Sequence, residues 1–192
     1  MKKILFLLLT MASFQATAQK NTDTRVFELR IYYAEPGKLD ALIQRFRQHT
    51  RKLFKQHGME NIAYWLPLDN EKNQLIYVLA YPSLEAREAS WKAFQADPKW
   101  VSAKAQSEVN GKLVNHVESF FMKATDFSPP ISALKKQHRI YEITTCEVKP
   151  GKMDELLAQF RDHTMSIWTR YGVSNVAYWT TIEKENTTPK LI

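Results

Sequence analysis

The sequence Arg25-Val26-Phe27-Glu28-Leu29 recurs 114 positions later, at residues 139–143, as Arg-Ile-Tyr-Glu-Ile. The same offset holds without a gap from residue 25 to residue 65. Three further pairs of stretches carry it: 36–40 with 150–154, 46–50 with 160–164, and 61–65 with 175–179. A repeat of this length indicates a duplicated domain rather than a solenoid.

The first copy reads as alternating strands and helices. Residues 26–33 alternate in polarity, so the spacing predicts a strand with two different faces. The apolar face carries Phe27, Leu29 and Ile31. The polar face carries Glu28, Arg30 and Tyr32. Further elements are expected as a helix at 39–54, strands at 60–67 and 74–81, helices after Ser83 and from Asp97-Pro98, and a strand at 113–122.

The order strand, helix, strand, strand, helix, strand is that of the split βαβ unit. The predicted class is therefore α+β, with tandem ferredoxin-like βαββαβ domains, the second copy being incomplete. A sheet of this kind has helices on one face only, so its other face needs a cover. The second copy or a second chain can supply it, and we expect self-association or intramolecular pairing of the two domains.

The chain divides into four parts. Residues 1–18 are expected to be a signal peptide, 24–123 the first domain, 124–137 a linker with Pro129-Pro130, and 138–192 the second domain. The second copy lacks a second helix and a fourth strand, which would leave an unpaired sheet edge. We expect either a fragment of a longer protein or completion by another subunit.

The first eighteen residues have the form of a secretory signal. Lys2 and Lys3 precede a short apolar run, and Ala16-Thr17-Ala18 is a small-x-small cleavage site. The apolar run is shorter than the ~20 residues that span a bilayer. We therefore expect an exported protein, periplasmic or secreted, with no stable membrane anchor after cleavage.

Composition excludes several classes of function. The net charge of +7 is scattered, without a run of five basic residues, so no nucleic-acid partner is expected. One cysteine rules out an intramolecular disulfide framework, and the five histidines show no metal-binding spacing. Nucleotide-binding glycine fingerprints are absent, so neither a metal nor another cofactor is expected.

Several motifs together resemble the NIPSNAP family. They are Val26-Phe27-Glu28-Leu29-Arg30-Ile31-Tyr32, Pro36-Gly37-Lys38, Phe46-Arg47-x-His49-Thr50, Tyr64-Trp65, Trp91-x-x-Phe94 and Asp97-Pro98-x-Trp100. The resemblance covers 25–123 in full and 139–192 in part. It implies the dimeric α/β-barrel superfamily fold, usually two tandem domains, and no settled catalytic activity. Eukaryotic members are associated with mitochondria and protein interactions, which does not carry over to a chain with an export signal.

Candidate site residues lie on the sheet face assigned to the space between the two copies. They are Glu28, Arg30, Tyr32, Tyr64, Trp65, His116 and Glu118. If His116 and Glu118 share a face with Glu28, they form a possible acid–base set. The alternative is that these groups form hydrogen-bonded pairs in the barrel interface. His49 and His163 occupy equivalent helix positions, where packing is favoured over a ligand or catalytic role.

Two functions remain open. The first is an exported NIPSNAP-like α/β-barrel protein that binds a partner protein or a small apolar ligand without catalysis. The aromatic pairs Tyr64-Trp65 and Tyr178-Trp179 would wall its cavity, one ring of each pair facing the helices. The second is a cofactor-independent monooxygenase or a haem-degrading oxidoreductase that uses the same cavity, which rests on fold analogy alone.

Overall fold

The computed structural model describes residues 23–134, 139–182 and 188–192. The expected signal peptide, residues 1–18, and the end of the expected linker lie outside these ranges. None of the helices in the described ranges combines the length and the apolar character that a membrane crossing requires.

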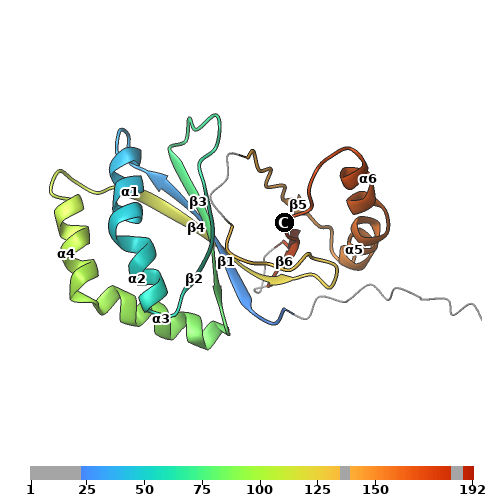
Figure 1. The fold of residues 1–192 in the computed structure, drawn as a ribbon, viewed down its shortest axis with the longest axis horizontal. Coiled ribbons are helices and arrows are strands. Elements are labelled where there is room, and N and C mark those ends of the chain that lie inside the picture. Colours follow the sequence, from blue (N-terminus) through green and yellow to red (C-terminus); the bar gives the residue numbers. More distant parts are fainter. Residues whose placement is uncertain (1–22, 135–138, 183–187) are drawn as a thin grey trace, which may run out of the picture.

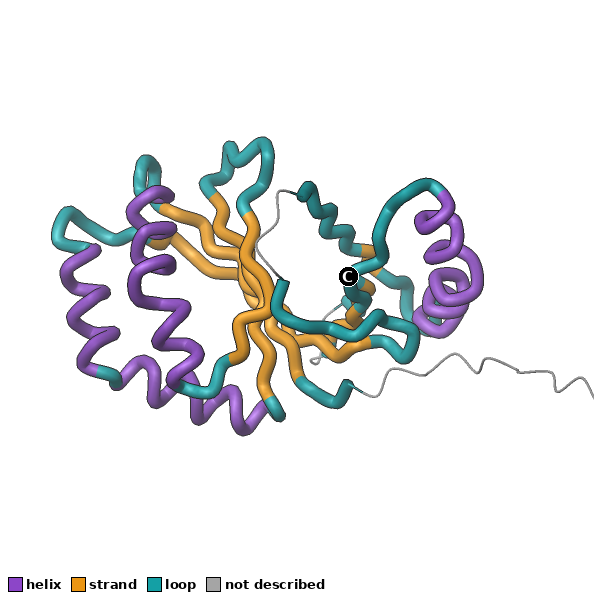
Figure 2. Tube along the Cα trace, viewed as in Figure 1, coloured by secondary structure: helices purple, strands orange, loops and turns teal. Residues whose placement is uncertain are grey.

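Residues 26–124 form a four-stranded antiparallel sheet covered on one face by helices (Figures 1 and 2). The elements are β1 (Val26–Ala34), α1 (Leu39–Arg45), η1 (Phe46–Thr50), α2 (Arg51–Gln56), β2 (Glu60–Trp65), β3 (Gln74–Tyr81), α3 (Leu84–Ala96), α4 (Pro98–Ser107) and β4 (Val114–Ala124). The strand order β2-β3-β1-β4 is that of a ferredoxin-like domain, which confirms the predicted fold class.

The predicted helix starts are present. The Ser83 hydroxyl accepts a hydrogen bond from the Ala86 amide at 3.1 Å at the start of α3. Asp97 accepts from the Lys99 amide at 2.8 Å, and Pro98 occupies the first position of α4. These caps fix the starts of α3, which packs against β3, and of α4, which packs against α1 and η1.

The expected helix at 39–54 contains a π-helical turn, η1, between α1 and α2. Inside it the Thr50 hydroxyl donates to the Arg45 carbonyl, five residues earlier, at 3.3 Å. The matched stretch does the same: η2 (Phe160–Thr164) lies between α5 (Met153–Gln159) and α6 (Met165–Arg170). Thr164 donates to the Gln159 carbonyl, also at 3.3 Å. The two matched stretches therefore share a local geometry as well as a sequence.

The C-terminal segment extends the sheet from the free side of β4 (Figure 1). Its strands are β5 (Cys146–Glu147), β6 (Trp179–Thr181) and β7 (Lys190–Leu191), in the order β4-β6-β7-β5. The match in sequence does not carry over to every strand: residues 139–143, which match part of β1, form no strand, and the stretch that matches β2 contributes only Trp179 to a strand, β6. That this segment is a second, incomplete ferredoxin-like copy remains a prediction.

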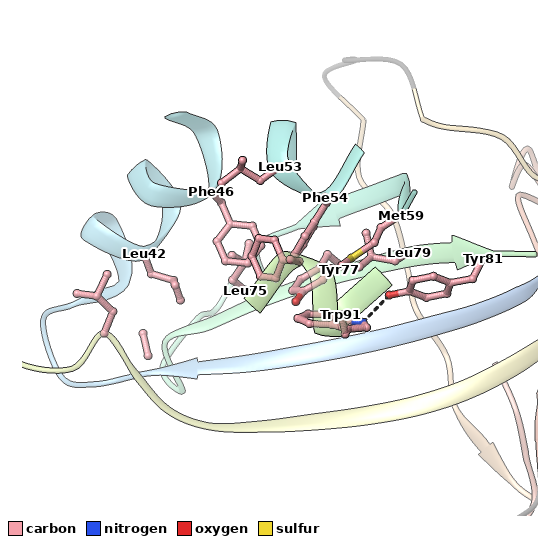
Figure 3. Close-up of a cluster of buried hydrophobic side chains, with 13 residues drawn as sticks. Leu42, Phe46, Leu53, Phe54, Met59, Leu75, Tyr77, Leu79, Tyr81 and Trp91 are labelled. Atoms are coloured by element: carbon pink, nitrogen blue, oxygen red, sulfur yellow. Dashed lines mark hydrogen bonds between the residues drawn. The ribbon is translucent and has the colours of Figure 1, made fainter. Parts of the chain in front are cut away.

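Two apolar cores lie on opposite faces of the sheet. The first, between sheet and helices, centres on aromatic rings that include Phe46, Phe54 and Tyr77 (Figure 3). The second lies on the other face and joins β1 to the C-terminal segment through Phe27 and Trp179, whose ring centroids are 5.7 Å apart. The central strand β1 is thus covered on both faces.

The described part of the expected linker is bonded to both sides of the molecule. The Ile131 carbonyl accepts from Arg25, and the Leu134 amide donates to the Ile62 carbonyl of β2 at 2.8 Å. The Ser128 hydroxyl accepts from the Tyr178 amide at 3.0 Å. This stretch is therefore a packed strap rather than a free tether.

Candidate functional site

The polar face of β1 points toward the helices, which corrects the expected orientation. Glu28, Arg30 and Tyr32 were assigned to the face away from the helices. In the structure Glu28 bonds Arg87 of α3, and Tyr32 packs edge-on against Phe46 at 5.7 Å. The reason is that β1 is buried on both faces, so its alternation separates two faces without saying which one meets the helices.

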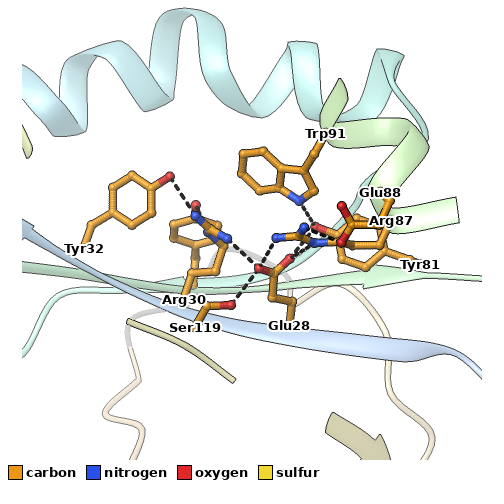
Figure 4. Close-up of polar contacts among 9 residues, drawn as sticks. Glu28, Arg30, Tyr32, Tyr81, Arg87, Glu88, Trp91 and Ser119 are labelled. Carbon is orange, nitrogen blue, oxygen red and sulfur yellow. Dashed lines mark hydrogen bonds and ion pairs between the residues drawn. The ribbon is translucent and has the colours of Figure 1, made fainter. Parts of the chain in front are cut away.

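Glu28 is the centre of a buried polar cluster (Figure 4). Its carboxylate is fully buried and accepts five hydrogen bonds. Arg30 and Ser119 donate to Oε1, Tyr81 donates to Oε2 at 3.0 Å, and Arg87 donates to both oxygens at 2.8 and 3.1 Å. Such a carboxylate is fully paired, as a buried charge must be to persist in a folded protein.

These contacts set the charge of Glu28. Burial alone would raise its pKa, but the Arg87 hydrogen bonds, the charge of Arg30 and the Ser119 hydrogen bond outweigh it. The pKa of Glu28 is lowered to about 2. Burial and the neighbouring Glu28 charge raise the pKa of Tyr81. Neither group changes protonation near neutral pH, so the cluster positions charges rather than carrying protons.

A cavity of about 250 Å³ opens beside this cluster. It is lined by Arg30, Arg87, Glu88, Trp91, Lys92 and Gln95. Both guanidinium groups lie over the Trp91 ring, Arg30 at 4.4 Å and Arg87 at 5.3 Å from the centroid. Sequence reasoning missed Arg87. The available signal was its position four residues before Trp91, because residues with that spacing are neighbours on a helix surface.

His116 and Glu118 do not join Glu28. The register of β4 pairs them with Tyr33 and Ile31, on the opposite face of the sheet from Glu28. Both side chains are exposed: His116 stacks on the Tyr33 ring at 4.0 Å, and Glu118 accepts from the Tyr33 hydroxyl at 3.1 Å. The structure therefore does not assemble the possible acid–base set.

The aromatic pairs divide between the two faces as expected. Tyr64 stacks on Tyr77 on the helix side at 5.3 Å, whereas Trp65 lies on the other side, 6.2 Å from Tyr141. Tyr178 likewise packs against Phe160, and Trp179 packs against Phe27. Each matched Tyr-Trp pair thus contributes one tryptophan to the face away from the helices.

Between these tryptophans lies a small apolar cavity of about 70 Å³. Its lining residues, none of them charged, are Ile62, Ala63, Trp65, Pro130, Ile131, Ser132, Leu134, Val176, Ala177 and Trp179. The indole Nε1 of Trp179 is buried and has no hydrogen-bond acceptor among the described residues. This space between the first sheet, the strap and the C-terminal segment can hold apolar groups but offers no charged group for chemistry.

The two equivalent histidines are not packing residues, which corrects that expectation. His49 and His163 are exposed, while the following residue of the first copy, Thr50, is buried inside η1. Within the described ranges, no three His, Cys, Asp or Glu side chains are grouped so that they could hold a metal ion.

The fold and these two sites define the class: a ferredoxin-like α+β domain whose helix-free face is covered by a strap and a C-terminal segment. The NIPSNAP family model matches residues 27–129, more than half of the chain. The chain belongs to the NIPSNAP family.

The chain is similar to a NipSnap homologue of Dictyostelium discoideum, with 23% identity over 77% of this chain and 60% of that protein. It is 26% identical to human NipSnap homologue 3A over 73% of this chain and 55% of that protein. It therefore spans less than two thirds of the length of either relative. A solved NIPSNAP-family protein of unknown function from Agrobacterium tumefaciens shares the fold. That match has 23% identity and a TM-score of 0.50 over 58% of this chain and 97% of the other.

Proposed function

We propose that this NIPSNAP chain is an exported, non-catalytic binding protein that takes up an apolar segment of a partner protein. The segment would bind on the helix-free face, across the opening of the space between the first sheet and the C-terminal segment rather than inside it. The observation that carries the proposal is the uncharged lining of that space, which is walled by the two equivalent tryptophans Trp65 and Trp179. Apolar, aromatic surfaces of this kind are enriched at protein-binding sites.

Size favours a partner protein over a small molecule. Ligand pockets enclose roughly 300–1,000 Å³, whereas this cavity measures about 70 Å³. Exposed apolar side chains instead lie in the two chain segments that meet at Trp65, one of the residues that line it. Trp65 contacts Tyr141. Leu66 directly follows Trp65 in the chain, and Ile140 directly precedes Tyr141. We call Leu66, Leu68 and Ile140, all exposed, the apolar rim. Exposed apolar patches mark interaction surfaces, and we assign the apolar rim to such a surface.

Binding without catalysis is supported by the titratable groups of the candidate site. Glu28 is held as a paired carboxylate, and His116 and Glu118 lie exposed on the other face of β1 and β4. The alternative, a cofactor-independent monooxygenase or haem-degrading oxidoreductase, needs room for a substrate between the sheets. A cavity of about 70 Å³ is far below that requirement.

Export is part of the proposal and rests on the sequence of residues 1–18. The mature chain would then begin at Gln19. Mass measurement of the protein purified from its native host tests this directly. A polypeptide that still carries Met1 through Ala18 in the cytosol would remove export from the proposal.

Site-specific photocrosslinking tests the binding surface. A photoreactive benzoylphenylalanine replaces Leu68, which is 80% exposed in the apolar rim, or Val109, which is 78% exposed in the α4–β4 connection. We expect one discrete crosslinked protein from position 68 and none from position 109. Adding Ile140→Glu should lower the yield from position 68, because it places a charge in the rim, and Val109→Glu should not.

Equal crosslinking from both positions would refute the surface. Native mass spectrometry of the same preparation adds a second test. Retention of haem or of an aromatic metabolite by the chain would overturn the non-catalytic, partner-binding proposal in favour of the oxidoreductase.

A further inference from the structure

The pocket between α3 and β1 has a chemistry that the apolar rim lacks. It lies on the opposite face of the sheet, among helix residues, and two arginines and a lysine line it. We propose that this pocket is a second binding site and that its ligand is a small organic carboxylate. The proposal is independent of partner binding at the apolar rim, because the two sites share no residue.

Glu28 holds the two guanidinium groups in place. Its carboxylate accepts hydrogen bonds from Nη1 of Arg30 and from both Nε and Nη2 of Arg87. The two guanidinium groups are therefore oriented before any ligand binds. Arg30 Nε also donates to the Tyr77 hydroxyl at 3.0 Å. Two guanidinium nitrogens do not bond to Glu28 or Tyr77. They are Arg30 Nη2, which has a 3.5 Å contact with the Tyr32 hydroxyl, and Arg87 Nη1. Donors fixed in advance lose little entropy when they bind an anion.

Glu88 already places a carboxylate on the side of the Arg87 guanidinium that does not face Glu28. Arg87 Nη1 donates to Glu88 Oε1 at 2.8 Å, and the Glu88 side chain is 71% exposed. An exposed ion pair of this kind contributes little to stability. An incoming carboxylate can therefore take the place of Glu88, which acts as a weak internal competitor.

The charge balance favours an anion. Arg30, Arg87 and Lys92 bring three positive charges, and Glu28 and Glu88 bring two negative ones. When Glu88 turns away, the pocket keeps an excess of two positive charges. Lys92 is exposed on the rim of the pocket, where it can attract an anion without being committed to another residue of the lining.

Size and geometry narrow the ligand class. About 250 Å³ is slightly below the range of roughly 300–1,000 Å³ that holds drug-sized ligands. A planar guanidinium matches the two oxygens of a carboxylate. Trp91 and the methylene groups of Lys92 and Gln95 can supply short apolar contacts. These features fit an acid of a few carbon atoms.

Titration of the full mature chain with succinate tests the proposal. Binding is followed by NMR through the indole N–H of Trp91, which donates to Tyr81 at 2.9 Å, and the arginine Nε–H signals. Glu88→Gln should strengthen succinate binding about two- to fivefold, because it removes the competitor. Lys92→Gln should weaken it by a similar factor. Both side chains are exposed, so both variants should fold normally.

Matched charge changes elsewhere serve as controls. Glu71→Gln in the β2–β3 loop and Lys52→Gln on α2 alter the net charge equally but lie outside the pocket lining. They should leave succinate affinity unchanged. If the control variants shift affinity as much as the pocket variants, the binding is a general charge effect and the site is refuted.

Two other outcomes overturn the proposal. Absence of any Trp91 or arginine shift at tens of millimolar succinate removes the site. Tighter binding of inorganic phosphate than of succinate, with the same response to Glu88→Gln, reassigns the pocket to phosphate-bearing ligands and overturns the carboxylate assignment.

Discussion

Arg87 of α3 donates two hydrogen bonds to the carboxylate of Glu28 on β1, from Nε to Oε2 at 3.1 Å and from Nη2 to Oε1 at 2.8 Å. The two residues are 59 positions apart, and the pair ties α3 to the central strand β1. Because Glu28 is fully buried, its charge is tolerated only while its partners remain. The pair is therefore both a structural tie and the support of the proposed carboxylate pocket.

Glu28→Gln should lower the free energy of unfolding by about 3 kcal/mol, because it leaves two partly buried arginines without their counter-charge. Urea denaturation at neutral pH measures this. Glu118→Gln on the neighbouring strand is the control. That side chain is exposed, and the change should stay within about 0.5 kcal/mol. A loss below about 1 kcal/mol for Glu28→Gln would contradict the assigned role.

The same carboxylate predicts an acid-sensitive component of stability. The folded pKa of Glu28, about 2, lies below its ordinary value of 4.5. Its contribution is therefore complete above about pH 5 and is lost as the pH falls from 4.5 toward 2. The stability difference between the native chain and Glu28→Gln should shrink by roughly 3 kcal/mol over that interval. A difference that is constant with pH would refute the assignment.

Matched positions in the two repeats predict unequal costs of truncation. Leu53 is 4% exposed, whereas Ile167, at the equivalent place, is 46% exposed. Leu53→Ala should cost about 2–4 kcal/mol, as for other buried leucines. Ile167→Ala should cost less than about 1 kcal/mol, because little burial is lost. Thermal or urea unfolding compares them, and equal costs would mean that Ile167 is covered in solution.

The π-helical turns allow a similar comparison. Thr50 is buried and its hydroxyl donates to the Arg45 carbonyl, whereas Thr164 makes the equivalent bond in a more exposed place. Thr50→Val should cost about 1 kcal/mol, and Thr164→Val a few tenths. Circular dichroism with urea measures both. If Thr164→Val costs as much as Thr50→Val, burial does not set the value of this bond.

Much of the fold was predictable from periodicity, but the orientation of β1 was not. The alternation of polar and apolar residues along β1 placed Glu28, Arg30 and Tyr32 on one face. It placed Phe27, Leu29 and Ile31 on the other face. It could not say that the polar set meets the helices, because tyrosines of β3 and arginine of α3 there satisfy the buried charges. A strand covered on both faces gives no such signal by itself.

The repeat in sequence does not extend to one strand of the structure. Residues 139–143 match 25–29 closely, yet only Cys146–Glu147 forms a strand in that part of the chain. In the first copy, β1 is paired on both sides, by β3 and β4. Among the described residues, β5 pairs only with β7. Local sequence sets the tendency to extend, but neighbouring strands decide whether a ladder forms.

The strap that follows β4 has a mechanical consequence. Arg25 and Ile62 bond its backbone from the first domain, and the Tyr178 amide bonds Ser128 from the C-terminal segment. A displacement of the C-terminal segment must therefore pull on β2, the strand that carries Trp65. A partner that displaced the C-terminal segment would therefore also move β2, at the far edge of the first sheet. The two halves of the molecule would shift together, because the strap connects them.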